Sequence, residues 1–194
     1  MKTDIILSGV GGQGILSIAA VIGEAALADD LYMKQAEVHG MSQRGGDVQS
    51  NLRISDNPIA SDLIPKGKAD LIISLEPMEA LRYLPYLKKD GWLVTNAVPF
   101  NNIPDYPDVD SVMAEINKLP NKIIVDVDKI AKEVGSLRVA NIVLLGATTP
   151  FLGIPYEKIA NGIKRIFDRK GEDIVNLNLK ALEAGKIAGE QFVS

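Results

Sequence analysis

The sequence predicts an α/β protein, a three-layer Rossmann-like domain in which helices cover both faces of a mostly parallel sheet. The first observation is a short apolar run at residues 5–7, which suits a strand buried on both faces. The second is a helical spacing of apolar residues that begins at Ile15, directly after a glycine-rich loop. The third is a strand-like run at residues 71–75, which a helix again follows. Alternating strands and helices of this kind form parallel sheets.

The loop between the first strand and the first helix contains four glycines within six residues, Gly9, Gly11, Gly12 and Gly14. Glycine adopts positive φ angles cheaply and, because it lacks a Cβ, lets backbone N–H groups approach a ligand closely. The helix that follows directs its free N–H groups and the positive end of its dipole at the loop. We therefore expect residues 9–14 to bind an anion.

The same loop matches the dinucleotide fingerprint GxGxxG. In that motif Gly9 would form the turn, Gly11 would allow close approach of the ligand, and Gly14 would let the helix pack on the strand. Glu37 stands at the end of the next strand, where a ribose-binding acid is expected. The motif leaves open whether the loop binds a dinucleotide, binds another anion or is only a tight turn.

Residues 32–38 have the pattern of a second strand, after a first helix that we expect to end at Asp29 and Asp30. A strand, helix, strand unit implies a right-handed crossover, so we expect the second strand to lie parallel to the first and beside it. Its C-terminal end would then lie next to the glycine loop.

A polar segment, EVHGMSQRGG, follows at residues 37–46. It contains the only histidine, His39, together with Met41, Arg44, Gly45 and Gly46. The planar guanidinium of Arg44 suits phosphate or carboxylate, and the paired glycines would let backbone amides join it. We therefore expect Arg44 to approach the amides of the glycine loop and to complete one anion-binding pocket. A surface salt bridge is the alternative for Arg44, and a structural role is the alternative for His39.

The remaining strands are expected at residues 48–54, 71–75, 92–95 and 123–125. The first of these alternates polar and apolar residues, which predicts burial of one face only. Residues 88–91 predict a turn, and residues 97–107, with three prolines, predict a surface loop.

Five helices follow in the same way, and no linker divides the chain, so we expect one domain over residues 1–194. The first of them is expected to start at Pro77, and the second to cover residues 111–118 with Asp110 or Ser111 as its cap. The third is expected to run from the cap Asp128 to Gly135, and the other two to cover residues 141–151 and 156–167. The segment 141–151 is apolar nearly all round, which predicts a core helix. A last helix has a broad apolar face, which predicts packing on two sides.

Composition excludes several classes of function. The formal net charge of −4 and a pI of about 5.1 argue against a nucleic-acid-binding protein. The chain has no cysteine and one histidine, so it holds no cysteine-ligated or multi-histidine metal centre, and we expect no metal site. No apolar run resembles a signal peptide or is long enough to span a bilayer, so we expect a cytoplasmic protein.

Four segments carry a resemblance that covers nearly the whole chain. They are GVGGQGI at residues 9–15, EVHGMSQRGGDVQS at 37–50, RISDNPIASDLI at 53–64 and ADLIISLEPMEALR at 69–82. Together they resemble the gamma-type domain of the thiamine-dependent 2-oxoacid:ferredoxin oxidoreductases. The form HGMSQRGG is most similar to the small beta subunit of the indolepyruvate ferredoxin oxidoreductase branch.

The resemblance implies a subunit of an enzyme that oxidatively decarboxylates a 2-oxoacid on thiamine diphosphate, passes electrons through iron–sulfur clusters to ferredoxin and captures the acyl group on coenzyme A. This chain shows neither a thiamine diphosphate motif nor cysteines for a cluster. We therefore expect that it binds no cofactor alone, carries no catalytic residue, and works with a larger catalytic subunit that holds the thiamine diphosphate and the clusters.

The resemblance also assigns roles to individual residues. It carries over Gly9, Gly11, Gly12, Gln13 and Gly14 as a first ligand loop and Arg44, Gly45 and Gly46 as a second. His39 and Met41 belong to the indolepyruvate form of the second loop, which makes them candidates for specificity or for an interface. Two alternatives stay open, a free-standing NAD(P)-binding dehydrogenase and a non-catalytic structural subunit.

Overall fold

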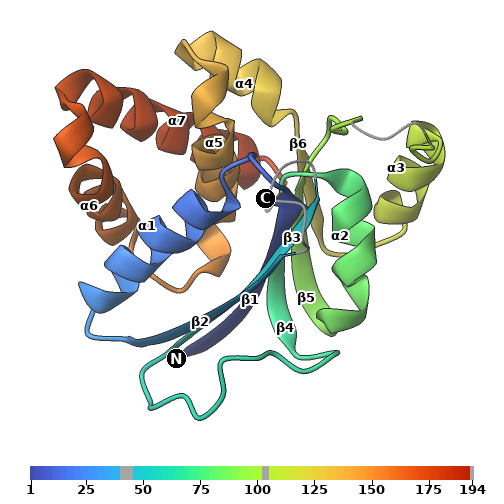
Figure 1. The fold of residues 1–194 in the computed structure, drawn as a ribbon, viewed down its shortest axis with the longest axis horizontal. Coiled ribbons are helices and arrows are strands. Elements are labelled where there is room, and N and C mark those ends of the chain that lie inside the picture. Colours follow the sequence, from blue (N-terminus) through green and yellow to red (C-terminus); the bar gives the residue numbers. More distant parts are fainter. Residues whose placement is uncertain (40–45, 102–104, 193–194) are drawn as a thin grey trace.

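The computed structural model describes residues 1–39, 46–101 and 105–192, and it confirms the predicted α/β class (Figure 1). In this part of the chain one six-stranded sheet, with the order β2-β3-β1-β4-β5-β6, forms the middle layer. Its strands are β1 (Lys2–Val10), β2 (Tyr32–His39), β3 (Asp47–Ser55), β4 (Ala69–Ser74), β5 (Leu87–Asn96) and β6 (Lys122–Val125). The pairs β1–β4, β4–β5 and β5–β6 are parallel, whereas β3 is antiparallel to β1 and to β2.

Helices cover both faces of the sheet. One face carries α1 (Ile15–Leu27), α4 (Val127–Val134), α5 (Ala140–Thr148), α6 (Tyr156–Phe167) and α7 (Glu172–Glu190), and the other carries α2 (Pro77–Tyr83) and α3 (Val109–Asn117) (Figure 1). Ile5 and Leu7 of β1 pack with the first group, and Ile6 packs with the second. Successive side chains of a strand point to opposite faces, so a strand between two helical layers is apolar throughout.

The position of β2 differs from the prediction. It lies at the edge of the sheet and pairs with β3, and β3 separates it from β1. The predicted parallel pair between the first two strands is therefore wrong. The chain forms a hairpin from β2 and β3 instead of a direct crossover, and the longer strand β3 takes the place beside β1 along its whole length.

Several element boundaries also differ. Strand β3 is buried on both faces near its middle, because Gln49 and Asn51 lie under other elements, so burial of one face only is wrong. Strand β5 includes the segment predicted as a turn. Helix α3 begins after the cap Asp108, two or three residues before the expected Asp110 or Ser111, and α4 begins after the cap Asp126, two residues before the expected Asp128.

Helices α5 and α7 pack with their backbones in close contact. Every residue of α5 from Asn141 to Thr148 is buried, which confirms the predicted core helix. A Cβ on Gly185 of α7 would overlap the carbonyl of Val143, and a Cβ on Gly189 would lie 2.7 Å from the carbonyl oxygen of Ala147. Glycine at these positions is what allows α7 to cover the apolar helix.

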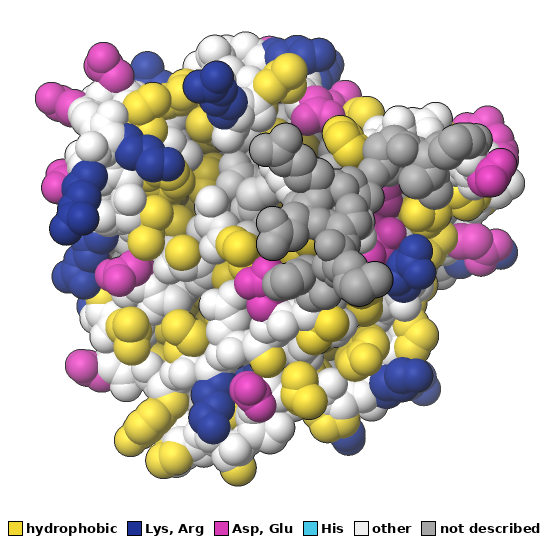
Figure 2. Space-filling view, viewed as in Figure 1, with side chains coloured by type: hydrophobic (Ala, Val, Ile, Leu, Met, Phe, Trp, Pro, Cys, Tyr) yellow, Lys and Arg dark blue, Asp and Glu magenta, His cyan; other side chains and the backbone are white. Residues whose placement is uncertain are grey.

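The described surface on the face shown in Figure 2 mixes charges of both signs. Lys and Arg side chains are interspersed with Asp and Glu along its outline, and hydrophobic side chains lie between them. In the described ranges, no helix combines the length and the apolar character that a bilayer crossing requires.

Candidate functional site at the carboxyl edge of the sheet

The carboxyl ends of β1 and β4 are the place where an open α/β sheet binds ligands. Strand β1 leads into α1 on one face, and its parallel neighbour β4 leads into α2 on the other. A reversal of this kind leaves a crevice beyond the strand ends. Ser8 and Ser74 lie side by side there, and the Ser8 hydroxyl donates to the Ser74 hydroxyl at 2.9 Å. The glycine loop, residues 9–14, occupies this edge as predicted.

The glycines of the loop have structural roles that differ from those the dinucleotide fingerprint assigns to them. Gly12 and Gly14 adopt positive φ angles of 104° and 87°, so the turn lies there and not at Gly9. Gly9 is the penultimate residue of β1, and its missing Cβ leaves room for the Gln13 side chain. Gly14 caps α1, and among the described residues no side chain caps that helix and no acid lies in its first turn. The Ser17 N–H donates to the Gly14 carbonyl, and within the described ranges no side chain occupies the start of α1, which leaves it open to a ligand.

Gln13 braces the glycine loop. Its side-chain oxygen accepts from the Val10 N–H at 2.8 Å, and its side-chain nitrogen donates to the Leu75 carbonyl at 3.2 Å. One amide thus links the end of β1 to the end of β4 across the crevice. Its polar atoms are engaged in holding the loop, so Gln13 positions the backbone N–H groups that a ligand would meet.

The second loop ends beside the first. The Gly46 carbonyl accepts from the Gly11 N–H at 2.9 Å, so the two glycine segments meet at the sheet edge. They meet although β1 and β2 are not neighbours, because both run antiparallel to β3 and therefore end at the same edge. Met41, Arg44, Gly45 and the side chain of His39 lie outside the described residues, so their roles stay predictions.

A cavity of about 240 Å³ opens beside the glycine loop on the α1 side of the sheet. Its walls come from the ends of β1, β4 and β5 and from the starts of α4 and α5. The lining residues are Gly12, Gln13, Leu75, Asn96, Val98, Pro99, Phe100, Val127, Asp128, Leu137, Arg138, Ala140 and Asn141.

Sequence reasoning missed the polar residues of this cavity. Asn96 ends β5, and its side-chain oxygen accepts from the N–H groups of Val98 and Val127. Asn141 donates to the Gly14 carbonyl at 3.1 Å, which ties α5 to the glycine loop. A polar residue at the end of a buried parallel strand was the available signal for Asn96. Asn141 and Arg138 are distant in sequence from the loop and gave no such signal.

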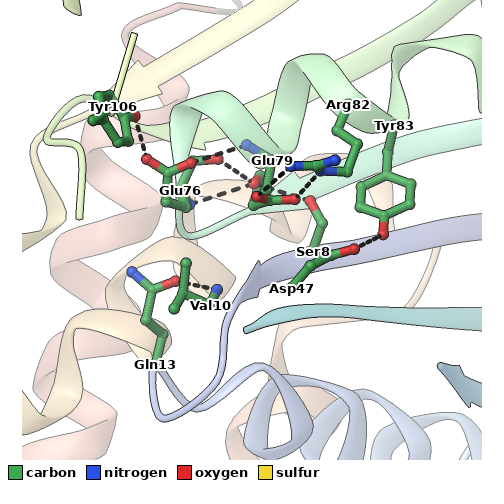
Figure 3. A network of polar contacts seen from close by, with 10 residues as sticks. Ser8, Val10, Gln13, Asp47, Glu76, Glu79, Arg82, Tyr83 and Tyr106 are labelled. Carbon is green, nitrogen blue, oxygen red and sulfur yellow. Dashed lines mark hydrogen bonds and ion pairs between the residues drawn. The ribbon is translucent and has the colours of Figure 1, made fainter. Parts of the chain in front are cut away.

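A polar network lies on the other side of the crevice, over α2 (Figure 3). Glu76, fully buried, caps α2 by accepting from the Glu79 N–H at 2.9 Å, and it also accepts from the Tyr106 hydroxyl at 2.5 Å. Tyr83 donates to Asp47 at 2.5 Å. The guanidinium of Arg82 binds the Glu79 carboxylate through two nitrogens, at 2.7 and 3.4 Å.

Burial governs the acidities in this network. Burial and then the Asp47 carboxylate, against the lowering effect of Arg82, together raise the pKa of Glu79 to about 7. Burial, followed by the hydrogen bond to a carboxylate, also raises the pKa of Tyr83 and of Tyr106 above the ordinary value. Both phenols therefore stay protonated and act as donors at neutral pH.

The chain does not fit an iron–sulfur cluster, since it has no cysteine to ligate one. Among the described residues, no group of three or more His, Asp or Glu side chains is placed to hold a metal ion. The free N–H groups of α1, the two asparagines and the Arg138 side chain instead suit an anionic organic ligand.

Comparison with known proteins defines the class. Residues 4–188 match the family described as pyruvate ferredoxin/flavodoxin oxidoreductase. The chain belongs to this family, and it is a subunit of the 2-oxoacid oxidoreductase type, as the motifs predicted.

Individual relatives show which members of the family the chain is similar to. The chain is 37% identical to the indolepyruvate oxidoreductase subunit IorB of Archaeoglobus fulgidus, over 95% of this chain and 94% of that one. It superposes on the gamma subunit of a keto/oxoacid ferredoxin oxidoreductase from Geobacter sulfurreducens with a TM-score of 0.72 and 27% identity, over 97% and 99% of the two chains.

A larger enzyme contains the same fold as one of its parts. The 2-oxoglutarate:ferredoxin oxidoreductase of Magnetococcus marinus, solved with 2-oxoglutarate, coenzyme A and succinyl-CoA bound, matches with a TM-score of 0.79 and 21% identity. The match covers 98% of this chain and 31% of that one, so the fold is one third of the larger polypeptide.

The topology does not support the alternative of a nicotinamide-dependent dehydrogenase. A dinucleotide fold places the ribose-binding acid at the end of a parallel strand beside β1. Here the strand between Glu37 and β1 is the antiparallel β3, and Glu37 is an exposed residue of the edge strand β2.

Proposed function

We propose that this chain is the small subunit of an indolepyruvate-type 2-oxoacid:ferredoxin oxidoreductase, which oxidatively decarboxylates an aryl 2-oxoacid to its acyl-CoA. The observation that carries the proposal is the 37% identity to an indolepyruvate oxidoreductase subunit over nearly the full length of both chains. The segment HGMSQRGG, at residues 39–46, supports the same branch.

The work is divided between two subunits. A larger partner carries the thiamine diphosphate and the iron–sulfur clusters and delivers electrons to ferredoxin, since this chain lacks the cysteines that a cluster needs. Coenzyme A supplies the acyl acceptor of the complete complex. The assembled enzyme acts in the cytoplasm.

The part of this chain is to hold an anionic group at the carboxyl edge. Gly12 and Gly14 present backbone N–H groups there, and the start of α1 adds its dipole, whereas the Gly11 N–H is engaged by the Gly46 carbonyl. Arg138 lines the adjoining cavity and provides a positive charge. Arg44, with Gly45 and Gly46, is proposed to close the same pocket from the second loop.

His39 and Met41 are proposed to set specificity or to contact the larger subunit. They stand in the same second loop, and the form HGMSQRGG sets the indolepyruvate branch apart. Their exchange is expected to change the choice of 2-oxoacid or the assembly of the complex, with the fold of this chain unchanged.

The test is reconstitution. The chain is purified alone and together with the larger subunit, and each preparation is assayed for iron, for thiamine diphosphate and for the coenzyme A-dependent reduction of methyl viologen by indolepyruvate. We expect the lone chain to be colourless and inactive and the complex to be active. Pyruvate and 2-oxoglutarate serve as competing substrates and should react at least tenfold more slowly.

Two results would contradict the proposal. One is 2-oxoacid oxidation by the lone chain, and the other is full activity of the larger subunit without this chain. Faster turnover of 2-oxoglutarate or pyruvate than of indolepyruvate would retain the class and overturn the branch.

A further inference from the structure

The start of β3 is fixed to α2 by side chains that the anion site does not use. Asp47 directly follows Gly46, whose carbonyl accepts from Gly11 where the two glycine loops meet. The Tyr83 hydroxyl donates to one carboxylate oxygen of Asp47 at 2.5 Å (Figure 3). The backbone of Asp47 is in register with Val10 of β1, and its side chain also ties this end of β3, where the second loop ends, to α2.

The second carboxylate oxygen of Asp47 is buried and has no hydrogen-bond partner, the one such side-chain atom in the described part of the chain. Glu79 of α2, only 4% exposed, lies on the same side of the crevice, and burial and then the Asp47 carboxylate raise its pKa. Two carboxylates cannot form a hydrogen bond with each other, because neither has a proton to donate. A proton on Glu79 would supply the missing donor.

The charge balance favours the same conclusion. Arg82 is the cation paired with these carboxylates in the described structure, and both of its contacts go to Glu79. The buried Glu79 carboxylate and the half-buried Asp47 carboxylate beside one guanidinium leave an uncompensated negative charge, which is costly away from water. One retained proton removes that charge.

We propose that Glu79 and Asp47 share one proton between α2 and β3, and that this protonated pair positions Gly46 against the glycine loop. Glu79 and Asp47 are thus positioning residues that act through the Gly46 carbonyl on the Gly11 N–H. The proposal concerns the folded chain and does not depend on which 2-oxoacid the complex uses.

The raised pKa of Glu79 supports a proton shared with Asp47. Burial, and then the Asp47 carboxylate, raise the pKa of Glu79 to about 7, against the lowering effect of Arg82. Among the described residues, the other titratable groups that face the pair are Tyr83 on α2, Glu76 at the cap of α2, and Tyr106 before α3. Both tyrosines are neutral donors at this pH, and each of them already donates to a carboxylate.

The sign of the pH dependence follows from linkage. Between pH 4.5 and about 7 the folded chain retains a proton that the unfolded chain has released. The free energy of unfolding therefore decreases as pH rises through this window. Above it the pair is ionised, and the two carboxylates repel each other across the junction of α2 and β3.

The experiment measures the urea midpoint of the full chain from pH 5 to pH 8.5. The midpoint of the wild type should fall over this range. In Glu79→Gln, whose neutral amide still donates to Asp47, most of that fall should be absent. The matched control is Glu115→Gln, at an exposed glutamate of α3 that pairs with Lys118, and it should keep the wild-type slope. A wild-type slope in Glu79→Gln would overturn the proposal.

A second measurement needs no variant. The side-chain carbon of Glu79, followed by ¹³C NMR in the wild type, should titrate with an apparent pKa of about 7. The amide resonance of Gly11 should shift with the same midpoint, because the Gly11 N–H donates to the Gly46 carbonyl. A Glu79 titration below pH 5 would disprove the shared proton. A Gly11 amide that stays constant through the Glu79 titration would disprove the positioning role.

Discussion

At the scale of single residues, a buried carboxylate and its arginine partner lie far from the site, at the amino edge of the sheet. Asp4 is 1% exposed, and the guanidinium of Arg53 binds both of its carboxylate oxygens, at 2.8 and 3.1 Å. Arg53 also donates to the carbonyls of Ser61 and Leu63, at 3.0 Å each. This one side chain therefore holds the loop that links β3 to β4 against the sheet.

The first prediction concerns Arg53. Arg53→Ala should lower the free energy of unfolding by about 3–5 kcal/mol, because it leaves the Asp4 carboxylate buried without its main partner. Lys2→Ala is the matched control, since Lys2 binds the same carboxylate at 2.9 Å from an exposed position, and it should cost at most about 1 kcal/mol. Urea denaturation at pH 7 measures both, and equal losses would contradict the assignment.

The residues of the site differ in how far the sequence predicted them. The glycine loop could be predicted because the conformation and the residue type coincide at Gly12 and Gly14. Glu79 could not be predicted, since its pKa depends first on burial and also on Asp47, which is distant in sequence and comes near it through the order of the strands. Gln13 was predicted as a ligand residue, and only the structure shows its bonds to Val10 and Leu75.

At the scale of elements, the packed helices followed the sequence well and the sheet order did not. The bounds of α6 agree with the predicted residues 156–167, because its amphipathic period is independent of distant partners. The order of β1, β2 and β3 depends on which strand fills the place beside β1, and the residue pattern of β2 does not contain that information. The same order of strands and helices along the chain is compatible with a hairpin of β2 and β3 and with a crossover that places β2 beside β1.

The second prediction concerns the contact between α5 and α7. Gly185→Ala should destabilise the chain by about 3 kcal/mol or more, because the new methyl overlaps the backbone of Val143 and the buried helices cannot separate freely. Gly23→Ala in α1 is the control, since its new methyl meets only the flexible end of Met33. Helix propensity favours alanine by about 1 kcal/mol, so this variant should be neutral or more stable. Thermal unfolding followed by circular dichroism compares the two.

At the scale of the whole molecule, the fold class could be predicted because local patterns and global architecture agree. The strands β1, β4 and β5 each lead into a helix, and the sheet collects the polar ends of these three strands at one edge. The chemistry of that edge is incomplete in this chain alone. The glycine loop, the cavity and the end of the second loop lie together there, so we expect this edge to face the larger subunit.

The last prediction tests that edge in the assembled complex. Arg138 lines the cavity beside Gly12, and we expect its guanidinium to bind a phosphate of coenzyme A there. Arg138→Ala should raise the KM for coenzyme A about tenfold, which corresponds to about 1.4 kcal/mol, near the lower limit for a hydrogen bond to a charged group. Arg138→Lys should have a smaller effect, because lysine keeps the charge and loses the planar contact.

Its controls separate the ligand from the fold and from the second loop. Arg165→Ala removes an exposed arginine that pairs with Glu24 on the α1–α6 side, and it should leave the KM unchanged. Arg44→Ala should raise the KM if the second loop closes the same pocket. Circular dichroism should show that each variant is folded. An unchanged KM in Arg138→Ala and in Arg44→Ala would place coenzyme A entirely on the larger subunit, and the glycine loop would then serve to hold the two subunits together.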